Sequence, residues 1–160
     1  MSMALVCVGR LKEKGFRLLA DEYLKRLTRY GGMTEIEIPD LPEPPGGNAA
    51  ALEERIRLRE GEGILKVIHP SDYVIALTIP GKRPDSPELA AHLGDLRTKG
   101  TRRIVFVIGG SLGLGRNVME RADEELSMSR MTFPHQMARV MLLEQIYRAE
   151  KILAGERYHK

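Results

Sequence analysis

Glycine and hydroxyl residues follow one of the most apolar stretches of the sequence. Residues 104–108 read I-V-F-V-I, and G-G-S-L-G-L-G comes directly after them. Backbone can approach a bound molecule closely where glycine has no Cβ, and ligands bind beyond the carboxyl ends of strands in open parallel sheets. The loop that starts at Gly109 is therefore a candidate floor for a small-molecule site, although turn glycines at positive φ give the same pattern.

Two phosphate-binding patterns fail in this loop. Gly110 and Gly115 have the glycine spacing of G-x-x-x-x-G-K-[ST], but Arg116 and Asn117 follow where that pattern needs a lysine and a magnesium-binding hydroxyl. The dinucleotide pattern G-x-G-x-x-G fails as well, because Val118 stands in the place of the third glycine. We therefore do not expect this loop to bind nucleotide phosphates.

A serine-hydrolase pattern does match the loop. Gly109, Ser111 and Gly113 fit G-x-S-x-G, the turn that presents a nucleophilic serine between a strand and a helix. An acidic residue and a histidine do follow Ser111 in the chain, as the order of a catalytic triad requires, but this agreement is only nominal. A chain of 160 residues is also short for a hydrolase fold of this kind. A hydrolase that uses Ser111 is the weaker alternative.

Hydroxyl groups alternate with soft apolar side chains in residues 126–133, which read L-S-M-S-R-M-T-F. This mixture suits a ligand with an adenine ring and a polar tail, although capping residues before a helix give a similar composition. A helix is then predicted from Pro134 to Ala154, with Gly155 as its stop signal. His135 and Arg139 are four residues apart, so they share a face of its first turns and either face a ligand or serve the structure.

Apolar side chains surround most of the circumference of this last helix. They are Met137, Val140, Met141, Leu143, Ile146, Tyr147, Ile152 and Leu153. A single buried stripe does not accommodate such a distribution. We therefore expect both the core and a second subunit to cover the helix.

The other residue types argue against several classes of site. The four histidines and the single cysteine lack metal-site spacing, and no metal is expected. Cys7 lies in the apolar run A-L-V-C-V and is expected to be a buried hydrophobe rather than a catalytic thiol. The net charge of +3 permits an acidic partner such as RNA without requiring one. No apolar run suits a membrane span or a signal peptide, so we expect a cytoplasmic protein.

Three continuous apolar runs predict strands that are buried on both faces, at residues 3–8, 73–79 and 104–108. Pro80 and Gly81 are expected to end the second of these strands. Residues 34–39 alternate between apolar and polar types, which predicts a half-exposed strand near a sheet edge. Helical segments separate the strands. The predicted fold class is α/β, with a mainly parallel sheet flanked by helices in a single domain of residues 1–160.

The first and third helices have clear sequence signals. The helix predicted for residues 12–29 has one apolar stripe, and the charged residues mostly off that stripe are expected on a solvated face. These charged residues are Arg17, Asp21, Lys25 and Arg29. The third helix is expected to start with Ser86 as the capping residue and Pro87 at the first helical position, and to end at Gly100.

The second helix is predicted for residues 49–68, with Asn48 as its N-cap. Gly61 and Gly63 lie in its second half, and each costs about 1 kcal/mol relative to alanine. We therefore expect this half of the helix to fray or bend.

Several longer motifs occur together along the chain. They are V-G-R-L-K-E-K, E-Y-x-K-R-L, I-P-G-K, I-G-G-S-x-G, L-S-x-S-x-M-T-F-P-H-Q-M-x-R-V, L-x-E-Q-x-Y-R-A and the terminal G-E-x-Y-H-K. With these motifs the sequence resembles the bacterial large-subunit ribosomal RNA pseudouridine N3-methyltransferases of the SPOUT superfamily. The resemblance covers essentially the whole chain. The loop of residues 112–116 departs from it, in a region that varies within the family.

The resemblance implies a homodimer in which a C-terminal trefoil knot binds S-adenosylmethionine. Such a knot is a rare exception to unknotted topology. By motif, the family's cofactor contacts correspond to Leu77, Gly109, Met128, Ser129, Arg130, Met131, Thr132 and Phe133. The glycine loop and residues 126–133 would then be two walls of one site.

The resemblance also implies the reaction, which is methyl transfer to N3 of a pseudouridine in large-subunit ribosomal RNA, with assembled ribosomes as the substrate. No metal is needed. His135 is a candidate base or orienting group, and Arg139 a candidate for stabilising negative charge or holding phosphate. His159, in the tail of residues 157–160, is a candidate for completing the partner subunit's site. The second alternative is a protein that keeps this fold and binds RNA or ribosomes without catalysis.

Overall fold

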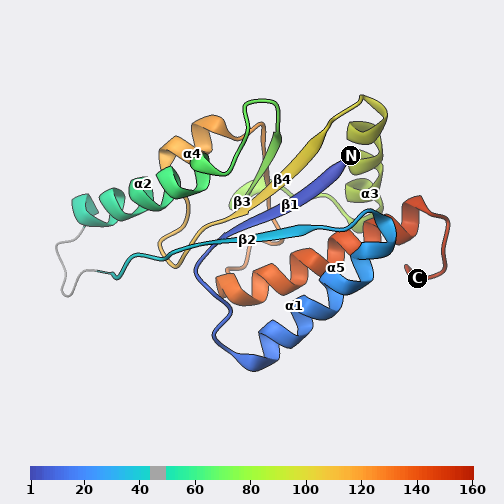
Figure 1. Ribbon diagram of the computed structural model, residues 1–160, viewed down its shortest axis with the longest axis horizontal. Helices are drawn as coiled ribbons and strands as arrows, with labels where there is room; N and C mark the ends of the chain where they lie inside the picture. The colour runs from blue at the N-terminus through green and yellow to red at the C-terminus, as the bar shows by residue number, and fades with distance from the viewer. Residues whose placement is uncertain (44–49) are drawn as a thin grey trace.

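Five parallel strands form one sheet in the order β2-β1-β4-β3-β5 (Figure 1). The structure is a computed structural model, and it describes residues 1–43 and 50–160. The strands are β1 (Ser2–Val8), β2 (Thr34–Ile38), β3 (Tyr73–Lys82), β4 (Arg103–Ile108) and β5 (Glu124–Leu126). The predicted mainly parallel α/β fold is confirmed, and β2 lies at an edge of the sheet as expected. The trefoil knot stays a prediction.

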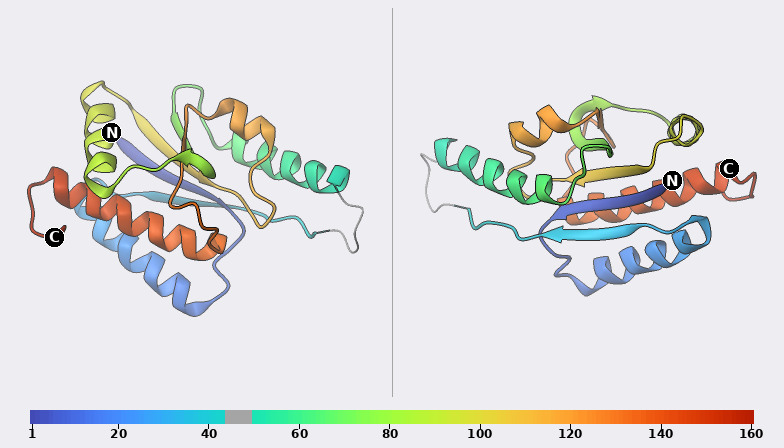
Figure 2. Two further views of the ribbon diagram at one scale, coloured as in Figure 1. Left: turned by 180° about the vertical axis from the view of Figure 1, so that it is seen from behind. Right: turned by 45° about the horizontal axis from the view of Figure 1, so that its top comes forward.

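Helices cover both faces of the sheet (Figures 1 and 2). They are α1 (Lys14–Leu27), α2 (Ala50–Lys66), α3 (Ser86–Thr98), α4 (Arg116–Arg121) and α5 (His135–Leu153), and a 3-10 turn (Thr28–Tyr30) follows α1. The larger core lies between one face of the sheet and α1, α3 and α5. The smaller core lies between the other face and α2 and α4. No helix in residues 1–43 and 50–160 combines the length and apolar character that crossing a lipid bilayer needs.

The central strands are apolar throughout because each one serves both cores. In β1, Leu5 and Cys7 face the larger core, while Val6 and Val8 face the smaller one. Successive side chains of a strand point to opposite faces, so a strand between two helical layers needs an apolar residue at every position. The prediction that Cys7 is a buried hydrophobe is confirmed, since its side chain is fully buried.

The strand boundaries around β3 differ from the prediction. Pro80 and Gly81 do not end the strand, which continues to Lys82 and pairs with β5, a strand that the sequence did not predict. A Cβ at Gly81 would lie 2.8 Å from the carbonyl carbons of Glu125 and Leu126. Glycine here acts as a contact point between two strands, because only a residue without a side chain allows this approach.

The prediction that α2 frays or bends at its glycines is wrong, because the helix continues through both of them to Lys66. A Cβ at Gly61 would lie 2.3 Å from the Oδ1 of Asn117, and one at Gly63 would lie 2.7 Å from the Cγ2 of Ile38. The glycines let α2 lie close to α4 and β2, which offsets their low helix propensity. The predicted N-cap Asn48 lies outside the described residues.

The caps of the other long helices are partly as predicted. The start of α3 is not capped by Ser86 but by Asp85, whose carboxylate accepts from the N–H of Glu88 at 2.8 Å while Glu88 accepts from the N–H of Asp85. Gly155 adopts φ +66° after α5 and confirms the predicted stop.

Candidate active site

A pocket of about 840 Å³ opens beyond the carboxyl ends of β3 and β4. Its walls come from the end of β3, the loop after β4, the loop before α5 and the first turn of α5. The lining residues are Leu77, Thr78, Ile79, Pro80, Ile108, Gly109, Gly110, Ser111, Leu112, Gly113, Leu114, Met119, Glu125, Met128, Ser129, Met131, Thr132, Phe133, Pro134, His135 and Ala138. Its place at this edge of a parallel sheet is where ligands of open α/β folds bind.

Seven of the eight residues predicted to contact a cofactor line this one pocket. They are Leu77, Gly109, Met128, Ser129, Met131, Thr132 and Phe133. The eighth, Arg130, is exposed and does not line it. Three segments that are separate in the sequence therefore meet, and the glycine loop and part of residues 126–133 line the same pocket.

The glycine loop has its shape for a structural reason as well. Gly113 adopts φ +82°, and its N–H donates to the carbonyl oxygen of Gly110 at 3.0 Å. A Cβ at Gly109 would lie 2.7 Å from the carbonyl carbon of Gly113. The two explanations offered for these glycines are thus compatible, since the turn that requires glycine also forms part of the pocket wall.

Short hydrogen bonds hold the loop before α5. The Ser127 N–H donates to the Lys82 carbonyl oxygen at 2.7 Å, and the Ser127 hydroxyl donates to the Ser129 carbonyl oxygen at 3.0 Å. The N–H of Met131 donates to the Ser129 hydroxyl, also at 3.0 Å. The Ser129 hydroxyl keeps its own proton for another acceptor. Met131, by contrast, is 70% exposed and offers an apolar surface to any molecule in the pocket.

His135 is the one predicted catalytic residue that lines the pocket. Partial burial lowers the pKa of its imidazole below the ordinary 6.5, and the positive charges of Arg139 and Lys12 lower it further, while Asp40 opposes them. The ring is therefore neutral at pH 7, and a neutral imidazole has one nitrogen free to accept a proton.

Arg139 does not line the pocket. Its side chain is 1% exposed, and its guanidinium bonds to Glu35, Glu37 and the carbonyl oxygen of Gly9. The helix pattern correctly placed Arg139 one turn after His135 but could not reveal how deeply it is buried.

His159 lies at the other end of α5. Its Nδ1 is 3.4 Å from the Nη1 of Arg148, which is 13 residues after His135. At 1.5 Å per residue, that separation is about 20 Å along the helix axis. Tyr158 anchors the tail there, because its hydroxyl donates to Glu144 at 3.0 Å and its ring packs on Tyr147 at 5.1 Å between centroids.

Two other candidate nucleophiles have different surroundings. Ser111 lines the pocket, but its hydroxyl donates to the carboxylate of Glu43, and no histidine in the described part of the chain bonds to it. Cys7 is fully buried, and burial raises the pKa of its thiol to about 12. A thiolate at Cys7 is therefore absent at neutral pH. Within residues 1–43 and 50–160, no three His, Cys, Asp or Glu side chains gather as a metal site requires.

Sequence reasoning missed the pair formed by Thr78 and Glu125 in the pocket wall. The Thr78 hydroxyl donates to Glu125 at 2.9 Å, and both residues line the pocket. Glu125 belongs to β5, a three-residue strand in the run D-E-E-L. Such a strand has no apolar periodicity, so no pattern in the sequence indicates that Glu125 faces the pocket.

Comparison with known proteins identifies relatives over the whole length. A family model described as "Predicted SPOUT methyltransferase" matches residues 1–159. Proteins named "Ribosomal RNA large subunit methyltransferase H" are 51% identical in Alkaliphilus oremlandii, 52% in Clostridium novyi and 50% in Bifidobacterium adolescentis. Each of these matches covers 100% of both chains.

A solved structure shares the fold at low sequence identity. It is a probable methylase family protein from Haemophilus influenzae Rd KW20, with a TM-score of 0.54 and 14% identity. The match covers 99% of the present chain and 70% of the other. At this identity the likeness supports the arrangement of helices and strands alone.

Proposed function

Because this chain belongs to the SPOUT methyltransferase family, we propose that it methylates large-subunit ribosomal RNA at N3 of a pseudouridine, with S-adenosylmethionine as the methyl donor. The observation that carries the proposal is the pocket beyond β3 and β4, which joins seven predicted cofactor contacts to His135. The printed name of the full-length relatives supports the RNA substrate.

The residues of the pocket fit the proposed cofactor. Its volume of about 840 Å³ lies within the ordinary range for small-molecule sites. Apolar groups at Leu77, Met128 and Phe133 suit the faces of an adenine ring, and the hydroxyls of Ser129 and Thr132 suit polar atoms. S-adenosylmethionine bound there supplies an electrophilic methyl group on a positively charged sulfur.

His135 has the position and the protonation state for a general base. Its neutral imidazole faces the pocket and can accept the N3 proton of the base, which leaves an electron pair on N3 for the new bond to carbon. Holding N3 in line with the methyl group supplies the remaining assistance. Contact between Arg139 and the substrate stays a prediction.

We also propose that the protein acts as a homodimer. Exposed apolar side chains lie on the neighbouring helices α1 and α5, at Leu18, Leu19, Met137 and Leu153. The tail of each chain lies about 20 Å along α5 from its own pocket, so His159 can contribute to a pocket only in a second copy. The homodimer and the role of the tail rest on this reasoning and on the family resemblance.

The proposed substrate is the assembled ribosome in the cytoplasm. The net charge of +3 is small for a protein that must hold free RNA by electrostatics alone. Ribosomal surfaces can share in recognition, so whole ribosomes should accept labelled methyl groups faster than a naked RNA hairpin does. Equal rates would contradict the ribosomal part of the proposal.

Calorimetric titration with S-adenosylmethionine tests the cofactor site. Thr132 lines the pocket and is exposed, so the bulky Thr132→Trp side chain can fill part of the pocket without disturbing the core. We expect the affinity to fall at least about tenfold, which corresponds to about 1.4 kcal/mol. The matched control is Lys99→Trp, at the exposed C-cap of α3 outside the pocket, and it should bind like the wild type. Wild-type affinity in Thr132→Trp would place the cofactor elsewhere.

A further inference from the structure

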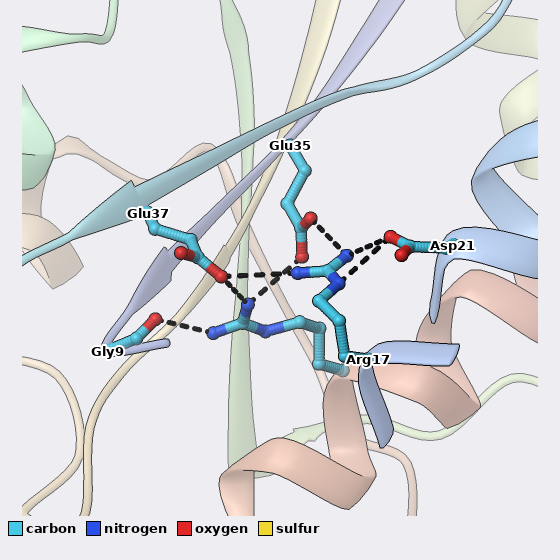
Figure 3. A network of polar contacts seen from close by, with 6 residues as sticks. Gly9, Arg17, Asp21, Glu35 and Glu37 are labelled. Carbon is cyan, nitrogen blue, oxygen red and sulfur yellow. Dashed lines mark hydrogen bonds and ion pairs between the residues drawn. The ribbon is translucent and has the colours of Figure 1, made fainter. Parts of the chain in front are cut away.

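Two arginines and two glutamates form an ion-pair network between α1, β2 and α5 (Figure 3). The Nη1 of Arg139 lies 3.0 Å from Glu35 and 2.7 Å from Glu37. Arg17 reaches the same two carboxylates, at 2.6 Å and 3.3 Å, and also pairs with the more exposed Asp21 at 2.8 Å. The expectation that Arg17 lies on a solvated face holds only in part, because its side chain is 31% exposed but also pairs with both glutamates. Two guanidinium charges meet two inner carboxylate charges, so the centre of the network is balanced.

Arg139 extends this network to the turn after β1. Its Nη2 donates to the carbonyl oxygen of Gly9 at 2.7 Å in a buried hydrogen bond. Gly9 adopts φ +85°, and its N–H donates to the carbonyl oxygen of Ile38 at 2.7 Å (Figure 3 labels Gly9). The loop that follows carries Lys12, whose charge acts on His135. One side chain thus joins α5, β2 and the turn at the end of β1.

The burial of Arg139 argues against direct contact with a substrate. The side chain is 1% exposed, and Glu35, Glu37 and Gly9 occupy its two terminal nitrogens. Its Nε is buried with no hydrogen-bond partner among the described residues. Reaching into the pocket would require breaking the network and leaving two carboxylates with too little positive charge around them.

Stability alone gives a weak reason for such a network. Removing charges from water is costly, and a well-packed apolar side chain often stabilises a buried position as well as an ion pair does. A guanidinium held by two carboxylates differs in that its planar donors fix one geometry. The network therefore suits a place where the relative position of three elements matters.

We propose that Arg139 is a positioning residue, which acts through Glu35, Glu37 and Gly9 to hold the first turn of α5 and the turn after β1 in register beside the pocket. His135 and Ala138, on that part of α5, line the pocket directly. The inference rests on the proposed function, since His135 is the group that Arg139 positions.

The double variant Glu35→Gln/Glu37→Gln tests this role without changing any residue that lines the pocket. Arg139 then loses both ionic partners, and we expect kcat to fall between about tenfold and a hundredfold, as a displacement near 1 Å can cause. Affinity for S-adenosylmethionine should change less than kcat. Arg139→Lys keeps the charge but loses the planar donors, so its kcat should lie between those of the wild type and Arg139→Gln.

The titration of His135 in the cofactor-free protein gives a readout that does not need activity. Arg139, Lys12 and Asp40 are the charged groups that act on His135. Nuclear magnetic resonance should find the His135 pKa lower in the double glutamine variant, because the Arg139 charge is no longer balanced. The pKa should be higher in Arg139→Gln, because that charge is absent. These shifts follow from charge alone, so they show that Arg139 stays coupled to His135, and the fall in kcat with little change in cofactor affinity decides the positioning role.

Glu150→Gln is the matched control. Glu150 is on the same helix, 2% exposed and paired with Arg97 at 2.6 Å. It does not line the pocket, and it lies 15 residues after His135, about 22 Å along the helix axis. This variant should lose stability and keep the wild-type kcat and His135 titration.

The inference is overturned if the double variant keeps the wild-type kcat. If the double variant does not fold, the two single glutamine variants decide by the same readouts. A wild-type protein that methylates no RNA would refute the proposed function instead, and the His135 titration would still test the network.

Discussion

His135 and Arg139 are four residues apart on one helix but lie in different environments. His135 lines the pocket with a lowered pKa, whereas Arg139 is buried in an ion-pair network with β2. Helical spacing predicts which side chains share a face, and this part of the prediction is confirmed. Helical spacing does not predict how deeply a side chain is buried. The partners of Arg139 are Glu35 and Glu37, which lie more than a hundred residues earlier in the sequence.

His135→Gln should lower kcat about a hundredfold to ten-thousandfold, the range that general bases contribute. In the wild type, kcat should stay constant as the pH is lowered past 6.5. It should decrease only when the pH is lowered further, to the reduced pKa of His135, because protonation then removes the base. His69→Gln, at an exposed histidine outside the pocket, should keep this acid limb. An unchanged pH profile in His135→Gln would exclude His135 as the base.

The same shift affects stability in a defined direction. The unfolded chain binds a proton at the ordinary pKa of His135, whereas the folded protein binds it only at lower pH. Between these two values the unfolded state holds more protons, so the free energy of unfolding rises with pH. The contribution of His135 is therefore complete above pH 6.5 and is lost as the pH falls through the lowered value.

At the scale of the elements, the apolar strands and long helices could be predicted, while the contacts between them could not. Hydrophobic runs and periodicity indicate β1, β4 and α5 because burial selects those residue types. No such pattern predicts β5 or the end of β3. Their pairing depends on the close approach of Gly81 to the backbone of β5, which is a contact between distant parts of the chain. The seven predicted cofactor contacts that line the pocket were identified from the family motifs and not from periodicity.

Gly61 in α2 gives the clearest stability prediction. Gly61→Ala would put a Cβ 2.3 Å from the Oδ1 of Asn117, whose amide bonds to the carbonyl oxygen of Leu58 and the N–H of Val118 at 3.0 Å each. Since Asn117 cannot move without losing these bonds, we expect the free energy of unfolding to fall by about 1–3 kcal/mol.

Gly15→Ala is the control for that substitution. Gly15 lies in the first turn of α1, and a Cβ there would meet nothing within 4 Å. Alanine should keep or raise the free energy of unfolding, by up to about 1 kcal/mol, because of its higher helix propensity. Urea denaturation of both variants measures the difference. A stabilised Gly61→Ala protein would show that the contact between α2 and α4 is looser than described.

At the scale of the whole molecule, the pocket is a product of the topology. The ends of β3 and β4, the loop before α5 and the first turn of α5 all line this one pocket at one edge of the sheet. The tail at the other end of α5 and the exposed apolar residues of α1 and α5 agree with a second subunit. In the proposed dimer, each of the two pockets would depend on the fold of a whole chain.

Methyl transfer to a ribosomal RNA base can be measured directly. Ribosomes that lack the modification are incubated with the protein and S-adenosylmethionine, and mass spectrometry is applied to nuclease fragments of the large-subunit RNA. We expect one added methyl group, on N3 of a pseudouridine, and its loss when the cofactor is omitted. Fragments of unchanged mass, from a protein that binds the cofactor, would contradict the proposed methyl transfer and favour a binding protein without catalysis.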